Sequence, residues 1–174
     1  MKTEKAYLAG GCFWCLEASY NILPGVIGVV SGYAGGALEN PTYDQVTSGL
    51  TGHAETVEIT YNPQKVSYQD LLKLFFILHD PSQKDGQGAD IGSQYRSAIF
   101  FTNKNQGKIS KEKIEELKKI GKYPEIYTEI LPINHFWPAE EYHQNYFEKH
   151  PEQAYCQAVI RPKIDKVNKY LKGQ

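Results

Sequence analysis

The segment Gly10-Gly11-Cys12-Phe13-Trp14-Cys15 constrains this chain more than any other part of it, because it joins a predicted strand to a predicted helix. The strand is predicted at residues 6–9, and the helix runs from about Cys12 to Asn21. Two adjacent glycines let the backbone turn sharply and approach a ligand closely. Cys12 is therefore expected in the first turn of a helix, where unpaired N–H groups and the helix dipole favour a thiolate.

An alternative interpretation of the same segment is structural. Phe13 and Trp14 would then be two core aromatic residues beside a cysteine that serves only as a small buried side chain. Two neighbouring aromatic rings are hard to bury together on one face of a short helix. At least one of them is therefore expected to line a pocket beside the sulfur of Cys12.

The rest of the chain alternates between predicted strands and helices. Further strands are predicted at residues 26–31, 53–61, 97–102 and 127–131, and further helices at residues 67–79, 103–122, 139–150 and 162–170. Two long irregular loops are expected at residues 32–52 and 80–93. At this length the pattern predicts one α+β domain over residues 1–174, with helices packed on a mainly antiparallel sheet. The two loops and the glycine turn are expected to meet at one end of it.

Composition excludes several classes of protein. The chain is 41% hydrophobic and 22% charged, which is the balance of a soluble globular protein. Its formal net charge of -1 indicates no general affinity for nucleic acid or an anionic membrane. The longest apolar run, Leu71 to Leu78, includes Lys73 and is too short to span a bilayer. No apolar signal region follows the charged N-terminus, so a cytoplasmic location is expected.

The three cysteines, Cys12, Cys15 and Cys156, are too few for a disulfide scaffold. In a reducing compartment they are metal ligands, redox catalysts or small buried residues. Cys12 and Cys15 form a Cys-x-x-Cys pair, a spacing found in dithiol redox sites and in half of a zinc site. The five histidines are scattered and provide no second ligand pair. The sequence therefore predicts neither a metal site nor a cofactor.

A carboxyl group is predicted on the apolar face of the strand at residues 53–61. The residues expected on that face are His53, Glu55, Val57, Ile59 and Tyr61. Burial disfavours the charged form and would raise the pKa of Glu55, which makes it a candidate proton donor near neutral pH. If the strand instead begins one or two residues later, Glu55 is exposed.

Six motifs occur in an order that resembles one known family. They are Gly11-Cys12-Phe13-Trp14, Gly32-Tyr33-Ala34-Gly35-Gly36, Asn40-Pro41-Thr42-Tyr43, Gly52-His53-Ala54-Glu55, His79-Asp80-Pro81 and Gln94-Tyr95-Arg96-Ser97. Together they resemble the A-type peptide methionine sulfoxide reductases over about residues 5–160. The resemblance implies a ferredoxin-like α/β plait core. It also implies reduction of the S epimer of methionine sulfoxide, both free and in oxidised proteins.

The resemblance also implies roles for individual residues. Cys12 would attack the sulfoxide sulfur, and Phe13 and Trp14 would form the apolar wall that holds the methyl group. Glu55 would protonate the sulfoxide oxygen. Methionine then leaves, and Cys12 remains as a sulfenic acid.

Three residues in or beside the two long loops complete the implied site. Tyr43 and Tyr95 would hydrogen-bond the sulfoxide oxygen, and Asp90 would help to orient the substrate. A loop tyrosine can present its hydroxyl to a ligand while its ring packs.

Cys156 resembles the resolving cysteine of this family, which would form a disulfide with Cys12 that thioredoxin reduces. Cys15 stands where the family often has glycine, so it could resolve Cys12 itself or act after Cys156 as a relay. The segment after Cys156 lacks a glycine-rich tail. If Cys156 begins a helix, local unfolding is needed for it to reach Cys12. A monomer is expected.

Two other functions remain open from the residues alone. A disulfide oxidoreductase built on Cys12-x-x-Cys15 would need Cys15 in every turnover and would not need Glu55. A binding module with a buried cysteine would hold a peptide in its aromatic pocket without turning it over. Neither accounts for six motifs in this order.

Overall fold

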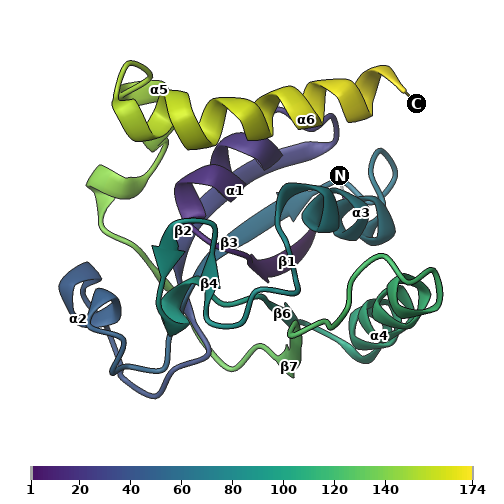
Figure 1. Cartoon of the computed structure of the whole chain (residues 1–174), viewed down its shortest axis with the longest axis horizontal. Coiled ribbons are helices and arrows are strands. Elements are labelled where there is room, and N and C mark those ends of the chain that lie inside the picture. Colours follow the sequence, from purple (N-terminus) through teal and green to yellow (C-terminus); the bar gives the residue numbers. More distant parts are fainter. Residues whose placement is uncertain (1, 174) are drawn as a thin grey trace.

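The sheet in the computed structural model, which describes residues 2–173, has six strands with helices packed against it (Figure 1). Its strands are β1 (Glu4–Ala9), β2 (Val26–Ala34), β3 (Ala54–Tyr61), β6 (Ala98–Phe101), β7 (Glu129–Pro132) and β8 (Phe136–Pro138). A separate hairpin consists of β4 (Gly86–Gln87) and β5 (Asp90–Ile91). The helices are α1 (Phe13–Asn21), α2 (Tyr43–Thr47), α3 (Tyr68–Leu78), α4 (Lys104–Lys119), α5 (Tyr146–Lys149) and α6 (Arg161–Lys172). Shorter turns are the 3₁₀ turns Ser93–Tyr95 and Glu141–His143 and the π-helical turn Cys156–Ile160.

The strand order is β7-β6-β1-β3-β2-β8, in which β6 and β7 pair in parallel and the other pairs are antiparallel. The chain order β1-α1-β2-β3-α3-β6 gives the central spatial order β6-β1-β3-β2. Each helical connection returns to a strand that is parallel to the first and separated from it by one strand. This arrangement is the ferredoxin-like plait, so the predicted α+β class with a mainly antiparallel mixed sheet is confirmed.

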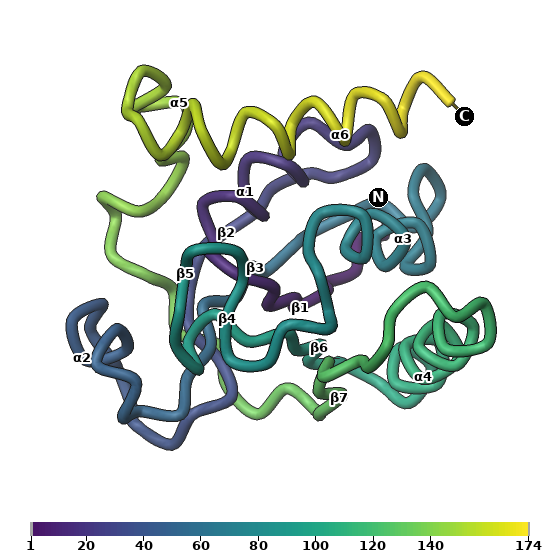
Figure 2. The backbone as a smooth tube through the Cα atoms, viewed as in Figure 1, coloured from purple at the N-terminus to yellow at the C-terminus, as the bar shows by residue number. Residues whose placement is uncertain are grey.

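Each face of the sheet has its own apolar cluster. The larger cluster lies between the sheet and helices α1, α3 and α6, and it contains all three cysteines. The smaller one lies on the opposite face and consists of four alanines and Phe100. In the backbone view α6 runs over α1, and β1 lies near the centre of the molecule (Figure 2). No helix within residues 2–173 has both the length and the apolar character needed to cross a membrane.

Most of the predicted elements are present. Helix α3 begins where its sequence predicts, because Ser67 and Asp70 form a reciprocal capping box. The predicted strand at residues 26–31 continues to Ala34, three residues into the expected loop. There β2 pairs with β8, and a Cβ on Gly32 would lie 2.4 Å from the carbonyl oxygen of Trp137. Glycine at this position therefore serves close strand packing rather than a turn. The expected loop at residues 32–52 also contains α2.

The helix predicted at residues 139–150 is wrong. This segment contains only the turn Glu141–His143 and the four residues of α5, with Asn145 in the left-handed region between them at a φ of +54°. The side chain of Gln144 accepts the N–H of Ser31 and donates to the carbonyl groups of Ser31 and Ala139. Hydrogen bonds to β2 thus override the local preference for a helix.

Candidate active site

The glycine turn places Cys12 at the start of α1. Gly11 has a φ of +89°, and its N–H donates to the carbonyl of Tyr95 at 3.2 Å. A Cβ at this position would lie 2.9 Å from the side chain of Gln87, so only glycine fits without strain. Cys12 occupies the N-cap in an extended conformation, one residue before the first helical residue. Its side chain makes no capping hydrogen bond to the first N–H groups of the helix, and burial raises its pKa, so the expectation that the helix start favours a thiolate at Cys12 is wrong.

Glu55 lies directly beside this turn. Glu55 is only 1% exposed, and its Oε2 accepts the backbone N–H of Phe13 at 2.9 Å. Burial raises the pKa of Glu55 to about 8, so the carboxyl is mostly neutral at pH 7. The alternative in which Glu55 is exposed is therefore wrong. Because Oε2 is occupied by Phe13, Oε1 remains available to carry the proton.

Trp14 and Phe13 form part of an aromatic wall. The Trp14 ring stacks on Tyr146 with a centroid distance of 3.6 Å and an interplanar angle of 5°. Its Nε1 donates to Nδ1 of His143 at 3.1 Å. The buried Phe13 ring packs against Tyr33 and His143. Trp14 remains partly exposed, so this wall reaches the surface.

Tyr43 and Tyr95 bring two hydroxyl groups to the same place. Burial, together with the charges of Glu55 and Cys12, raises the pKa of Tyr43 to about 12 and raises that of Tyr95 further. Both hydroxyls are therefore protonated at neutral pH and can donate. Neither makes a hydrogen bond to another group within residues 2–173. They are available to an oxygen atom of a ligand.

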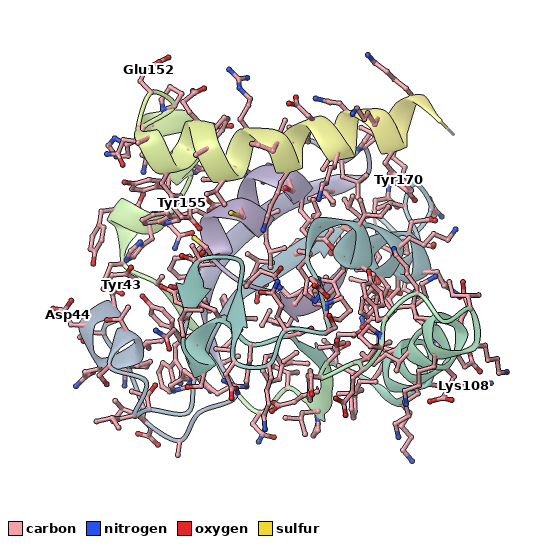
Figure 3. The ribbon with its side chains drawn as sticks, viewed as in Figure 1. Tyr43, Asp44, Lys108, Glu152, Tyr155 and Tyr170 are labelled. Carbon is pink, nitrogen blue, oxygen red and sulfur yellow. The ribbon has the colours of Figure 1, made fainter. Side chains whose placement is uncertain are left out.

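Asp90 lies on β5, where its carboxylate accepts the hydroxyl of Tyr155 at 2.7 Å. The same hydroxyl lies 3.9 Å from the Cys15 sulfur. Tyr155 and Tyr43 lie on the same side of the molecule (Figure 3). Sequence reasoning missed Tyr155, although its place directly before Cys156 was a usable signal.

Glu140 is a second residue that sequence reasoning missed. Its carboxylate accepts the hydroxyl of Tyr33 at 3.0 Å and the backbone N–H of Tyr43 at 3.0 Å. It therefore ties the start of α2, whose first residue is Tyr43, to the sheet. Its position in the segment wrongly predicted as a helix concealed this role.

The three cysteines are free thiols, and all are buried. Burial raises the pKa of Cys12, while the hydrogen bond from Cys12 and the charge of Lys163 outweigh burial and lower the pKa of Cys15 to about 7. The two thiols thus titrate as a pair in which one thiol stabilises the thiolate of the other. Cys156 begins the π-helical turn that precedes α6, and its side chain is completely buried. Burial, and then the charge of Cys15, raise its pKa.

The described residues, 2–173, contain no cluster of three or more histidine, cysteine or acidic side chains that could hold a metal ion. The arrangement instead combines a thiol at a helix start, a neutral carboxyl, two tyrosine hydroxyls and an aromatic wall. Such a set can deliver a sulfur nucleophile and a proton to one polar, sulfur-containing group.

Comparisons with known proteins agree with this chemistry. The family described as peptide methionine sulfoxide reductase matches residues 4–174. The peptide methionine sulfoxide reductase MsrA of Picrophilus torridus is 50% identical over 164 residues, covering 94% of this chain and 93% of that protein. The structure of reduced Mxr1 from Saccharomyces cerevisiae is similar, with a TM-score of 0.80 and 36% identity over 89% of this chain and 90% of the other. Mxr1 in complex with Trx2 is similar with a TM-score of 0.57 and 30% identity over 83% and 85% of the two chains.

Proposed function

The chain belongs to the peptide methionine sulfoxide reductase family, and on that premise we propose that residues 1–174 form one domain that reduces the S epimer of methionine sulfoxide through Cys12. Free methionine sulfoxide and oxidised proteins are both substrates. The observation that carries the proposal is the buried carboxyl of Glu55, held by Phe13 at the turn that presents the thiol. A neutral carboxyl beside a thiol supplies the proton that sulfoxide reduction consumes.

In the first step the sulfur of Cys12 attacks the sulfoxide sulfur and releases its thiol proton, while Glu55 protonates the oxygen. The oxygen ends on Cys12, which is oxidised by two electrons to a sulfenic acid, and the substrate sulfur is reduced by two electrons to methionine. Glu55 regains its proton from solvent. The raised pKa of Glu55 supports this role, because an ionised carboxylate could not donate.

Binding precedes this chemistry. Phe13 and Trp14 hold the methyl group and exclude water from it, while the hydroxyls of Tyr43 and Tyr95 donate hydrogen bonds to the sulfoxide oxygen. Asp90 helps to orient the substrate. Its carboxylate is itself held in place because it accepts the hydroxyl of Tyr155. Support comes from the two tyrosine hydroxyls without partners and from the partial exposure of Trp14.

The second step regenerates the thiol. The Cys156 thiol attacks the sulfenic sulfur of Cys12, water leaves, and a disulfide forms. A dithiol of thioredoxin then reduces the disulfide and becomes oxidised itself. The complex of the similar Mxr1 with Trx2 supports this partner. Because Cys156 is buried in a π-helical turn, that turn must open first, and Cys15 either competes with Cys156 or relays its oxidation.

We also propose a location and an oligomeric state. All three cysteines are free thiols, and the cytoplasm keeps thiols reduced, which supports a cytoplasmic location. The enzyme is proposed to act as a monomer.

A single-turnover experiment tests the mechanism. Reduced enzyme is mixed with a stereochemically defined methionine S-sulfoxide without reductant, and methionine formed and thiols lost are counted. The variants are Cys12→Ser, Cys15→Ser and Cys156→Ser. We expect a burst of about one methionine per active site that only Cys12→Ser abolishes, and the thiol count in the other two identifies the resolving cysteine. A wild type that exchanges disulfides but forms no methionine would be a dithiol oxidoreductase instead.

A further inference from the structure

A basic cleft lies beside the proposed active site, between the C-terminal end of α3 and helix α6. Its volume is about 720 Å³. The charged and aromatic side chains that line it include Lys122, Lys163, Lys166, Lys169, Tyr123 and Tyr170. Of these lysines only Lys163 acts on the active site, where its charge lowers the pKa of Cys15. The cleft therefore calls for an explanation of its own.

The lysines of the cleft have no acidic partners within residues 2–173. This differs from α4, where Lys113 pairs with Glu116 and Lys118 pairs with Glu115. The one acidic residue in the cleft, Asp80, accepts the N–H and the hydroxyl of Ser82. The cleft thus holds an excess of positive charge in a chain whose formal net charge is -1. Such a surface attracts an anionic ligand.

The shape of the positive surface indicates the kind of anion. Lys163, Lys166 and Lys169 are spaced by three residues, so they lie on the same side of α6. Their row extends roughly 9 Å along the helix. A row of carboxylates on an extended peptide has a matching length.

Two segments connect the lining of the cleft to the active site. Gln87 lines the cleft, and it pairs directly across the β4–β5 hairpin with Asp90 of the active site. Tyr155, which bonds Asp90, directly precedes the helical segment that carries the cleft lysines. Figure 3 shows Tyr155 and Tyr170 toward opposite ends of this segment. A peptide that extended from the active site across the hairpin would therefore reach the cleft.

We propose that this cleft binds an acidic stretch of the substrate polypeptide and makes the enzyme selective for methionine sulfoxides with nearby acidic residues. The inference rests on the proposed function and adds the substrate class to it. Lys166 and Lys169 lie roughly 16–21 Å along the helical segment from Tyr155. An extended peptide spans that distance with about five or six residues. The carboxylates are therefore expected about five or six positions from the oxidised methionine.

The test compares two peptides that carry one methionine S-sulfoxide. One has aspartates five and six positions away, on the N-terminal or the C-terminal side, and the other has asparagines there. A capped single methionine sulfoxide serves as the substrate without flanks. Wild type is compared with the double variant Lys166→Gln/Lys169→Gln. Lys104→Gln/Lys111→Gln on α4 removes the same charge elsewhere and is the matched control.

We expect wild type to show a KM for the acidic peptide roughly three- to tenfold below that for the neutral one, as exposed ion pairs provide. High salt and the cleft variant should abolish this difference, while the control keeps it. Activity on the capped amino acid should be equal in all three proteins. Equal KM values for the two peptides in wild type would overturn the proposal. If the cleft variant changed only the KM for thioredoxin, the proposal would also be overturned, and the cleft would be assigned to the reductant. No turnover of the capped substrate by wild type would instead refute the proposed function.

Discussion

Replacing Glu55 with glutamine is expected to stabilise the protein near neutral pH while removing its activity. The pKa of Glu55 rises from its usual 4.5 to about 8 on folding, because the carboxyl is buried. Above pH 4.5 the folded state thus holds a proton that the unfolded state has released. The contribution of this proton to the free energy of unfolding is fully present below pH 4.5. It is lost as the pH rises from there through 8. At about 1.4 kcal/mol per pH unit, this loss reaches about 3 kcal/mol between pH 5 and pH 7.5.

Glu55→Gln does not titrate, and its amide oxygen can still accept the N–H of Phe13. Urea unfolding under reducing conditions at pH 5 and pH 7.5 measures the effect. We expect the stability of the variant relative to wild type to increase by about 3 kcal/mol between these pH values. The burst of methionine should slow by roughly 10²- to 10⁴-fold.

The matched control is Glu58→Gln on the same strand. Glu58 accepts hydrogen bonds from Lys5 and Tyr7 at the partly exposed surface, so this variant should gain no stability at either pH. If Glu55→Gln gains no more than the control between pH 5 and pH 7.5, the carboxyl of Glu55 is ionised in the folded protein. The role of Glu55 as proton donor would then be wrong.

Three further substitutions test the elements that support the site. Gly11→Ala should lose about 1–3 kcal/mol of stability in urea unfolding, because φ is +89° and the methyl group would meet Gln87 at 2.9 Å; no loss would show that the turn can relax. Ser67→Ala removes the cap of α3 and should cost about 1 kcal/mol in thermal unfolding with kcat unchanged; a fall in kcat would contradict a purely structural role. Tyr146→Ala removes the ring stacked on Trp14 and should raise KM for a sulfoxide peptide up to about tenfold, whereas Tyr146→Phe should not. An equal rise in both would assign the effect to the hydroxyl.

Local sequence patterns predicted the elements whose reasons are local. The capping box at Ser67 determines where α3 begins, and the alternation of residues 53–61 places Glu55 on the apolar face of β3. The glycine pair before Cys12 predicted the turn that presents the thiol. These features depend on neighbours within a few residues, so they can be seen without a fold.

Residues 139–150 show why other features could not be predicted. Gln144 forms its hydrogen bonds with β2, and Glu140 bonds to Tyr33 and Tyr43, both about 100 positions earlier in the chain. No spacing within the segment reveals such partners. The composition of the segment therefore favoured a helix that these distant bonds replace.

The sequence by itself determined the α+β class, the turn at Cys12, the buried carboxyl of Glu55 and the resemblance to one family. The tertiary structure alone decided that Tyr155 bridges Asp90 and Cys15 and that four lysines line one cleft beside them. The physical reason is the range of the interactions. Periodicity and capping act between residues close in sequence, whereas burial, pKa shifts and charge clusters depend on which distant segments the fold packs together.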